Sequence, residues 1–269
     1  EMAPEIVGLL SLVSLIALVM LRVPVAVAMG GVAVISFAQL QGLNRALNKL
    51  SDASFELADG YSLSVVPLFL LMGAVAARSG MSADLFRAAN SLFSGIRGGL
   101  AMATVGACAG FGAVSGSSLA TAATMSRIAL PQMDAHGYDQ RLSTGAIAAA
   151  GTLGILIPPS VILIIYSIIA GASIEELFAA GLMPGILLAV LYIVAVSLIS
   201  RFRPDWSGTQ PSAPFGERLR DLLRSWEIII LFGVSVGGIY IGWFSPTEAA
   251  SVGAFLAILI GFATRRLDF

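Results

Sequence analysis

Long apolar runs alternate with short polar connections along most of the chain. A helix needs about 20 consecutive apolar residues to cross the hydrocarbon core of a bilayer, and several runs approach that length. These runs lie at residues 6–21, 23–40, 61–78, 178–200, 226–243 and 247–264. The pattern therefore predicts a series of membrane-spanning helices.

Two further apolar runs are interrupted by small polar or helix-breaking residues. The first, from Gly110 to Thr124, reads GFGAVSGSSLATAAT, and the second, from Gly151 to Tyr166, reads GTLGILIPPSVILIIY. Lipid cannot hydrogen-bond a free backbone group, so broken backbone at membrane depth persists only inside protein or beside a cavity. Two such breaks close together in sequence indicate a binding site for a small solute or ion.

Composition excludes the soluble classes of protein. Hydrophobic residues make up 57% of the 269 residues and charged residues only 12%, with a mean hydropathy of +0.91. The net charge of -1 excludes nucleic acid as an obvious partner, and the single cysteine, Cys108, excludes a disulfide framework. We therefore expect an all-α integral membrane protein whose surroundings are a lipid bilayer.

The distribution of basic residues predicts the orientation in the membrane. If loop 201–224 is cytoplasmic, all of the 15 basic residues except Arg45 and Lys49 fall on the cytoplasmic side. This asymmetry requires that Arg97 and Arg127 lie on the same side of the membrane. Residues 98–134 are therefore predicted to enter from the cytoplasm and return as a re-entrant hairpin, with the N-terminus of the chain outside.

A faint internal repeat runs in opposite directions. Pro24, Ala28, Gly31 and Val34 have the spacing of Pro246, Ala250, Gly253 and Leu256. Inverted repeats are typical of secondary transporters. Because the second copy stops early, we expect an incomplete second repeat and an amino-terminal part of a longer subunit. The expected division is 1–80 scaffold helices of repeat one, 81–97 interfacial arm, 98–134 re-entrant hairpin, 135–175 broken helix, 176–200 long scaffold or connecting helix, 201–225 cytoplasmic amphipathic loop, and 226–269 start of repeat two.

Oxygen atoms dominate the chemistry of the interrupted runs. Pro158 and Pro159 have no N–H, so the carbonyls of Gly154 and Ile155 lose their helical donors. Together with the hydroxyls of Ser115, Ser117 and Ser118, these carbonyls form a set of hard ligands without a carboxylate, which suits Na⁺. The helix starts at Ser160 and Leu119 would favour an anionic group. The alternative is that glycine and serine only allow close helix packing.

The sequence resembles a known transporter family in three segments. GAVSGSSLATAATM, GTLGILIPPSVILIIY and GWFSPTEAASVGA are similar to the large membrane subunit of tripartite ATP-independent periplasmic (TRAP) transporters. The resemblance implies an elevator-type fold in the bacterial inner membrane with a periplasmic N-terminus. It also implies Na⁺-coupled uptake of an organic acid, such as a dicarboxylate, a sialic acid or a sugar acid. The implied partners are a periplasmic substrate-binding protein and a small four-helix membrane subunit.

The resemblance also implies which residues bind ligands. Ser115 and Ser117 are expected to bind Na⁺ opposite the backbone oxygens of Gly154, Ile157 and Pro159. We expect Glu248 either to complement the dipole of its helix or to face the binding protein. The residues expected to contact the substrate are Ser115, Gly116, Ser118, Pro158 and Ser160.

Three other functions remain open at this point. The first is a Na⁺/dicarboxylate carrier of the related elevator type that needs no binding protein, and the second is a passive channel. The third is an intramembrane serine protease that uses Ser115. Because that chemistry needs a base near the serine, and the only histidine, His136, falls in a polar cytoplasmic connection, we expect no catalytic residue and no enzyme.

Overall fold

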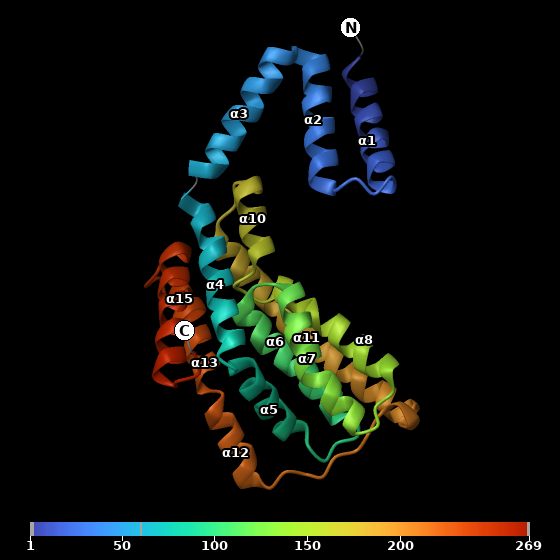
Figure 1. The fold of residues 1–269 in the computed structure, drawn as a ribbon, viewed down its shortest axis with the longest axis vertical. Coiled ribbons are helices and arrows are strands. Elements are labelled where there is room, and N and C mark those ends of the chain that lie inside the picture. The colour runs from blue at the N-terminus through green and yellow to red at the C-terminus, as the bar shows by residue number, and fades with distance from the viewer. Residues whose placement is uncertain (1–2, 60, 268–269) are drawn as a thin grey trace. The chain divides into compact units, whose positions relative to one another are not determined.

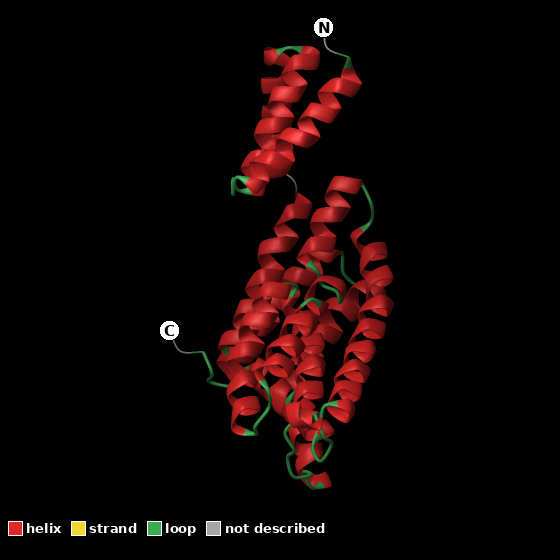
Figure 2. Cartoon of the chain, turned by 90° about the vertical axis from the view of Figure 1, so that its right-hand side faces the viewer, coloured by secondary structure: helices red, strands yellow, loops and turns green. Residues whose placement is uncertain are grey.

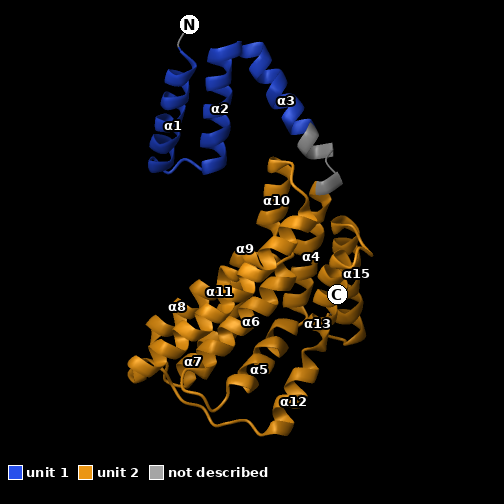
Figure 3. Cartoon of the chain, turned by 180° about the vertical axis from the view of Figure 1, so that it is seen from behind, with its two compact units in different colours: residues 1–61 blue, residues 62–269 orange. Residues whose placement is uncertain are grey.

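Every regular element in the described part of the chain is helical. The computed structural model describes residues 3–59 and 61–267, and within these ranges it contains no strand (Figures 1 and 2). The predicted all-α class is confirmed for these residues. The chain divides into two compact units, Glu1–Tyr61 and Ser62–Phe269 (Figure 3), and each is described by itself.

Residues 3–59 of the first unit form three helices, and the last of them was not predicted. α1 (Pro4–Met20) and α2 (Val25–Gln41) are apolar and lie side by side (Figure 1). α3 (Leu43–Asp59) follows directly after Gly42. Its polar residues keep its average hydropathy near zero, so a search for apolar runs passes over it, although its apolar residues gather on one side.

The second unit begins with a sharply bent pair of helices. A short 3₁₀ turn, η1 (Tyr61–Ser64), leads into α4 (Val65–Arg78), and α5 (Met81–Phe93) follows at an angle of 68°. Gly80 takes a left-handed conformation with φ of 77° at the bend. α5 buries Met81 and Phe86 and packs along α6. Its predicted place at the membrane surface stays a prediction.

The two interrupted runs form the centre of the second unit. α6 (Gly99–Ser115) and α7 (Ser118–Ala135) form a helical hairpin. α8 (Gln140–Gly151) and the single turn α9 (Leu153–Leu156) precede the break, and α10 (Val161–Ala170) follows it. α6 is buried along most of its length and contacts α4, α5, α7, α8, α9, α11 and α13. The turn of the hairpin is therefore carried by the most enclosed helix of the unit.

The remaining helices surround this centre. They are α11 (Ile174–Phe202), η2 (Pro204–Trp206), α12 (Phe215–Arg224), α13 (Trp226–Phe232), the π-helical turn η3 (Gly233–Gly237), α14 (Gly238–Tyr240) and α15 (Pro246–Ala263). α15 packs along α4, and α12 packs along α5. α12 is the amphipathic helix expected within loop 201–225.

Several described helices have the length and composition of membrane spans. α11 and α15 are each long and apolar enough to cross a bilayer. Three bent pairs pass the same test together: α4 with α5, α8–α9 with α10 at 41°, and α12 with α13–α14 at 45°. The predicted runs 178–200 and 247–264 coincide with α11 and α15 to within a few residues. The inverted orientation of the repeats and the elevator arrangement stay predictions.

Candidate functional site

The hairpin turns at two residues whose backbones differ sharply. Gly116 has φ of 61°, a left-handed conformation that ends α6, and its N–H donates to the carbonyl of Gly112 over 2.9 Å. Ser117 is extended and caps α7, because its hydroxyl oxygen accepts from the N–H of Ala120 at 3.3 Å. The sequence SGSS thus supplies both the end of one helix and the start of the next.

The second break also has a local cause. Ile157, which precedes Pro158, is extended with φ of -79° and ψ of 122°. Its N–H still donates to the carbonyl of Leu153 at 2.9 Å, so α9 ends in a last hydrogen-bonded turn. The Pro158–Pro159 peptide bond is cis. Ser160 then caps α10 by accepting from the N–H of Leu163 at 3.4 Å, and all residues from 157 to 160 are buried.

A backbone hydrogen bond joins the two breaks directly. The N–H of Val161 donates to the carbonyl oxygen of Gly116 at 3.1 Å. A Cβ atom added at Gly116 would lie 2.6 Å from the carbonyl oxygen of Pro159, and one added at Gly154 would lie 3.1 Å from the carbonyl of Ser117. Only glycine permits this approach of the two backbones. We call residues 115–118 together with residues 154–161 the junction.

Buried hydroxyls lie inside the junction. The Ser115 hydroxyl lies 2.8 Å from the Thr121 hydroxyl, and it also donates to the carbonyl of Ser117 over 3.5 Å. Both Ser115 and Thr121 are buried. Sequence reasoning missed Thr121. The sequence did carry a signal for it, because Thr121 follows Ser117 by about one helical turn. At that spacing the Thr121 side chain points back toward the start of α7.

Neighbouring helices hold the junction through glycines that were also missed. On α11, a Cβ at Gly181 would lie 2.7 Å from the carbonyl oxygen of Leu156, and one at Gly185 would lie 2.7 Å from Cγ1 of Ile157. On α4, a Cβ at Gly73 would lie 2.6 Å from Cα of Ser115. Gly181 and Gly185 have the four-residue spacing of small residues at close helix contacts, and this spacing was the available signal.

The structure brings most of the predicted site residues together. Gly154 lies against Ser117 and Ser118, while Gly116 lies against Pro159. Pro158 and Ser160 are buried in the same segment. The side chain of Ile157 contacts α11 through Gly185, so this residue could offer the junction only its backbone oxygen.

Oxygen atoms at the junction differ in how much of their hydrogen-bonding capacity is already used. The carbonyl of Gly116 accepts from Val161, and that of Ser117 accepts from Thr121 at 3.0 Å. A hydroxyl oxygen that accepts one hydrogen bond, as those of Ser117 and Ser160 do, keeps a second lone pair. The polar atoms gathered here are hydroxyl and carbonyl oxygens, which are ligands suited to a hard cation.

A hydrogen bond closes the base of the hairpin, at the end opposite the junction. The phenol oxygen of Tyr138 accepts from the N–H of Leu100 at 3.2 Å and so links the chain after α7 to the start of α6. Burial raises the pKa of the Tyr138 phenol, which keeps its hydroxyl protonated. The hairpin is thus fixed at both ends.

Two charged or titratable residues singled out from the sequence lie away from the junction. His136 caps the C-terminus of α7 and is exposed, and the 18-residue length of α7 separates it from Ser117 by about 27 Å. It therefore cannot act as a base for Ser115. Glu248 is exposed and forms a capping box with Ser245, whose N–H and hydroxyl both reach its carboxylate at 2.9 Å. A contact with a binding protein stays a prediction.

Comparison with known proteins identifies the family. The family model described as "Tripartite ATP-independent periplasmic transporter, DctM component" matches residues 12–269. A C4-dicarboxylate TRAP transporter large permease protein of Pseudomonas aeruginosa is 37% identical over 220 residues, which are 82% of this chain and 51% of that protein.

Other relatives carry different substrate names. An ectoine TRAP transporter large permease protein of Halomonas elongata is 34% identical over 259 residues, covering 94% of this chain and 59% of that protein. A sialic acid TRAP transporter permease protein of Haemophilus influenzae is 34% identical over 203 residues, covering 76% of this chain and 33% of that protein. The chain spans about half the length of the curated C4-dicarboxylate relatives that it matches. With the family match covering nearly all of its residues, the chain belongs to the large membrane subunits, or DctM components, of the tripartite ATP-independent periplasmic transporters.

Proposed function

We propose that the junction is part of the path for Na⁺-coupled uptake of an organic acid. The observation that carries this proposal is the main-chain hydrogen bond from Val161 to Gly116 beside the buried hydroxyl of Ser115. Two helix interruptions that meet in this way concentrate polar atoms inside an otherwise apolar helical unit. Such an arrangement is the usual basis of a solute site in secondary transporters.

Na⁺ is held, in this proposal, by the hydroxyls of Ser115 and Ser117 and by the backbone oxygens of Gly154, Ile157 and Pro159. The close approach of Gly154 to Ser117 and of Gly116 to Pro159 supports the grouping. A cation bound by neutral oxygens keeps its positive charge, so it would attract an anionic substrate to the same place.

The substrate is an organic acid that binds beside the ion. Ser117 and Ser160 cap helices that start at the junction, so the partial positive charge of both helix starts favours a carboxylate. The residues proposed to contact it are Ser115, Gly116, Ser118, Pro158 and Ser160. Because the relatives are named for C4-dicarboxylate, ectoine and sialic acid, membership of the family leaves the individual compound open.

The proposed setting is the bacterial inner membrane with the N-terminus in the periplasm. A periplasmic binding protein delivers the substrate, a small four-helix membrane subunit completes the complex, and the hairpin and broken helix move together against a scaffold as an elevator. The relatives' names describe permeases of TRAP transporters, which supports a transport role and not an enzymatic one.

Reconstitution tests the proposal against its main alternative. The complete subunit that contains this chain is placed in liposomes with its small membrane subunit, and uptake is measured with and without an inward Na⁺ gradient. We expect uptake only when both the gradient and the binding protein are present. Uptake that needs the gradient alone would support the carrier that works without a binding protein. Uptake without a gradient would contradict Na⁺ coupling.

A further inference from the structure

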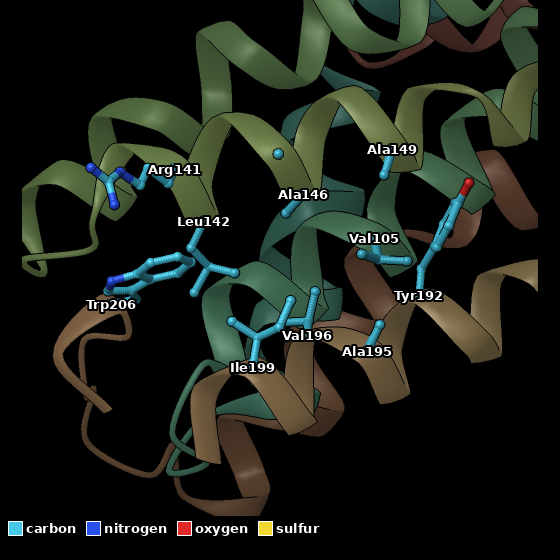
Figure 4. Close-up of a pocket in the computed structure, with 11 residues that line it drawn as sticks. Val105, Arg141, Leu142, Ala146, Ala149, Tyr192, Ala195, Val196, Ile199 and Trp206 are labelled. Carbon is cyan, nitrogen blue, oxygen red and sulfur yellow. The ribbon is translucent and has the colours of Figure 1, made fainter. Parts of the chain in front are cut away.

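A groove with one basic end lies between α8 and α11, away from the junction. It encloses a cavity of about 150 Å³, and Val105 of α6 contributes to its floor (Figure 4). The lining residues are almost entirely apolar, with small side chains on α8. They include Arg141, Gly145, Ala149, Val196 and Trp206.

The apolar part of the groove has the lining and surroundings of a site for a hydrocarbon chain. Gly145 lines the groove on the α8 side without a side chain. Ala149 lies on the same side and Val196 on the α11 side (Figure 4). Next to the groove, α11 exposes Leu191 and Leu198, each with about half of its surface accessible. α11 has the length and composition of a membrane span, so large apolar side chains exposed on it are surfaces for lipid.

The basic end consists of two arginines around one indole. The guanidinium of Arg141 lies 5.7 Å from the ring centre of Trp206, and that of Arg203 lies 5.8 Å from the same ring. Within residues 3–59 and 61–267, no ion pair involves either guanidinium. Asp139 lies nearby, but its carboxylate accepts from the backbone N–H of Arg141 at 2.8 Å and caps α8. Asp205 is exposed beside the indole.

We propose that this groove binds an anionic phospholipid, with one acyl chain between α8 and α11 and the phosphate at Arg141 and Arg203. Guanidinium groups bind phosphate through charge-assisted hydrogen bonds, and tryptophan favours the level of the headgroups. The orientation predicted from the charge asymmetry puts both arginines on the cytoplasmic side, where anionic headgroups attract basic residues near the membrane surface. The lipid would bridge the broken helix and α11 on the side remote from the junction.

A photoactivatable lipid tests the proposal in the complete subunit. Phosphatidylglycerol carrying a diazirine in its acyl chain is mixed into liposomes that contain the complex, and crosslinked peptides are quantified by mass spectrometry. We expect labelling of residues 141–149 and 192–199. A phosphatidylcholine probe with the same chain should label them several-fold less, and excess inorganic phosphate should not compete, because the acyl chain holds the lipid in place.

Two variants separate the charge from the groove. Arg141→Gln with Arg203→Gln removes the basic end, and loss of about 1 kcal/mol per arginine near an anionic lipid predicts a decrease in labelling of roughly tenfold or more. Ala149→Phe fills the groove without a change in charge and should lower labelling by both lipid probes. Arg220→Gln, on the exposed side of α12, is the matched control and should label like the natural sequence.

The outcomes are distinguishable from those for transport, because labelling requires no uptake. Equal labelling by the phosphatidylglycerol and phosphatidylcholine probes in the natural sequence would overturn the anionic preference. Unchanged labelling in Ala149→Phe would overturn the groove as the site, even if the double arginine variant failed to fold. A decrease in Arg220→Gln equal to that of the double variant would show attraction to the membrane surface in general and would also overturn the proposal.

Discussion

The backbone N–H of Val161 donates a 3.1 Å hydrogen bond to the carbonyl oxygen of Gly116, and thereby joins the turn of the hairpin to the start of α10. A carbonyl at a left-handed helix end has no partner in its own helix. In an apolar environment an unsatisfied carbonyl costs several kcal/mol. The hydrogen bond removes this cost and holds the two interruptions at a fixed separation, so a change at Gly116 should affect both.

Gly116→Ala should destabilise the protein and abolish most uptake. Alanine at φ of 61° costs about 1–2 kcal/mol, and its Cβ would lie 2.6 Å from the carbonyl oxygen of Pro159. The backbones must then move apart, which stretches the hydrogen bond from Val161. Thermal unfolding of the purified complex and uptake into liposomes measure the two effects.

Gly137→Ala is the matched control for Gly116→Ala. Gly137 has φ of 71°, so it carries the same conformational strain, but a Cβ there meets nothing within 4 Å. We expect a small decrease in melting temperature and unchanged uptake. Equal behaviour of the two variants would show that the contact with Pro159 contributes nothing beyond the strain of a left-handed residue.

Ser115→Ala with Ser117→Ala should raise the Na⁺ concentration needed for half-maximal uptake. The change removes two hydroxyl oxygens from the proposed ion site and alters side-chain volume only slightly. Loss of a hydroxyl ligand also leaves the Thr121 hydroxyl without its 2.8 Å partner, which adds a cost of about 1 kcal/mol to stability. Initial uptake rates at a series of Na⁺ concentrations give the measurement.

A control on the same helix separates ion binding from helix stability. Ser126 of α7 donates to the carbonyl of Ala122 at 2.7 Å, about two turns beyond the junction. Ser126→Ala should leave the Na⁺ dependence unchanged. If the double variant at Ser115 and Ser117 keeps the natural Na⁺ dependence while it folds, the assignment of these hydroxyls to the ion is wrong.

Local chemistry explains which features of this fold were predictable. Pro158 and Pro159 cannot donate to a helix, so the end of α9 could be placed near them from the sequence alone. Gly116 among serines likewise predicts a helix end followed by a cap, and the structure contains both. Each of these signals acts within one helical turn of the residue that produces it.

Contacts between residues that are far apart in the sequence could not be predicted from such local signals. The approach of Gly154 to Ser117 depends on how α9 packs against the hairpin, and no periodicity along either segment specifies it. Thr121 belongs to the junction only because α7 starts at Ser118 and turns its side chain toward Ser115. α3 was missed for a different reason, since its charged and amide side chains remove the apolar run that marks a membrane helix.

Cysteines at positions 97 and 127 should both react only from the cytoplasmic side. Arg97 and Arg127 are exposed, and the hairpin prediction places them on the same side of the membrane. The substitutions Arg97→Cys and Arg127→Cys are made separately in a Cys108→Ala background, because Cys108 is buried in α6. A membrane-impermeant maleimide is applied to right-side-out and inverted vesicles. Labelling of the two cysteines from opposite sides would contradict the re-entrant hairpin.

Arg266→Gln should destabilise the contact between α5 and α13. The Arg266 guanidinium lies 2.5 Å from a carboxylate oxygen of Asp84 and 3.3 Å from one of Glu227, and both carboxylates are almost fully buried. Arg87 also pairs with Asp84, which leaves Glu227 as the carboxylate that depends on Arg266. Removal of one partner of a buried ion pair costs about 3–5 kcal/mol. Because the Arg266 side chain is 36% exposed, water screens part of this effect, and we expect a loss of about 2 kcal/mol.

Thermal unfolding of three variants distinguishes this charge effect from a general effect of the position. Arg265→Gln alters the neighbouring exposed arginine and should leave the melting temperature unchanged. Glu227→Gln combined with Arg266→Gln removes the buried charge together with its partner, so it should recover part of the stability lost in Arg266→Gln. The double variant could instead be less stable than Arg266→Gln by the full cost of a second independent change. In that case the two side chains do not act as a pair, and the contact between α5 and α13 depends on packing alone.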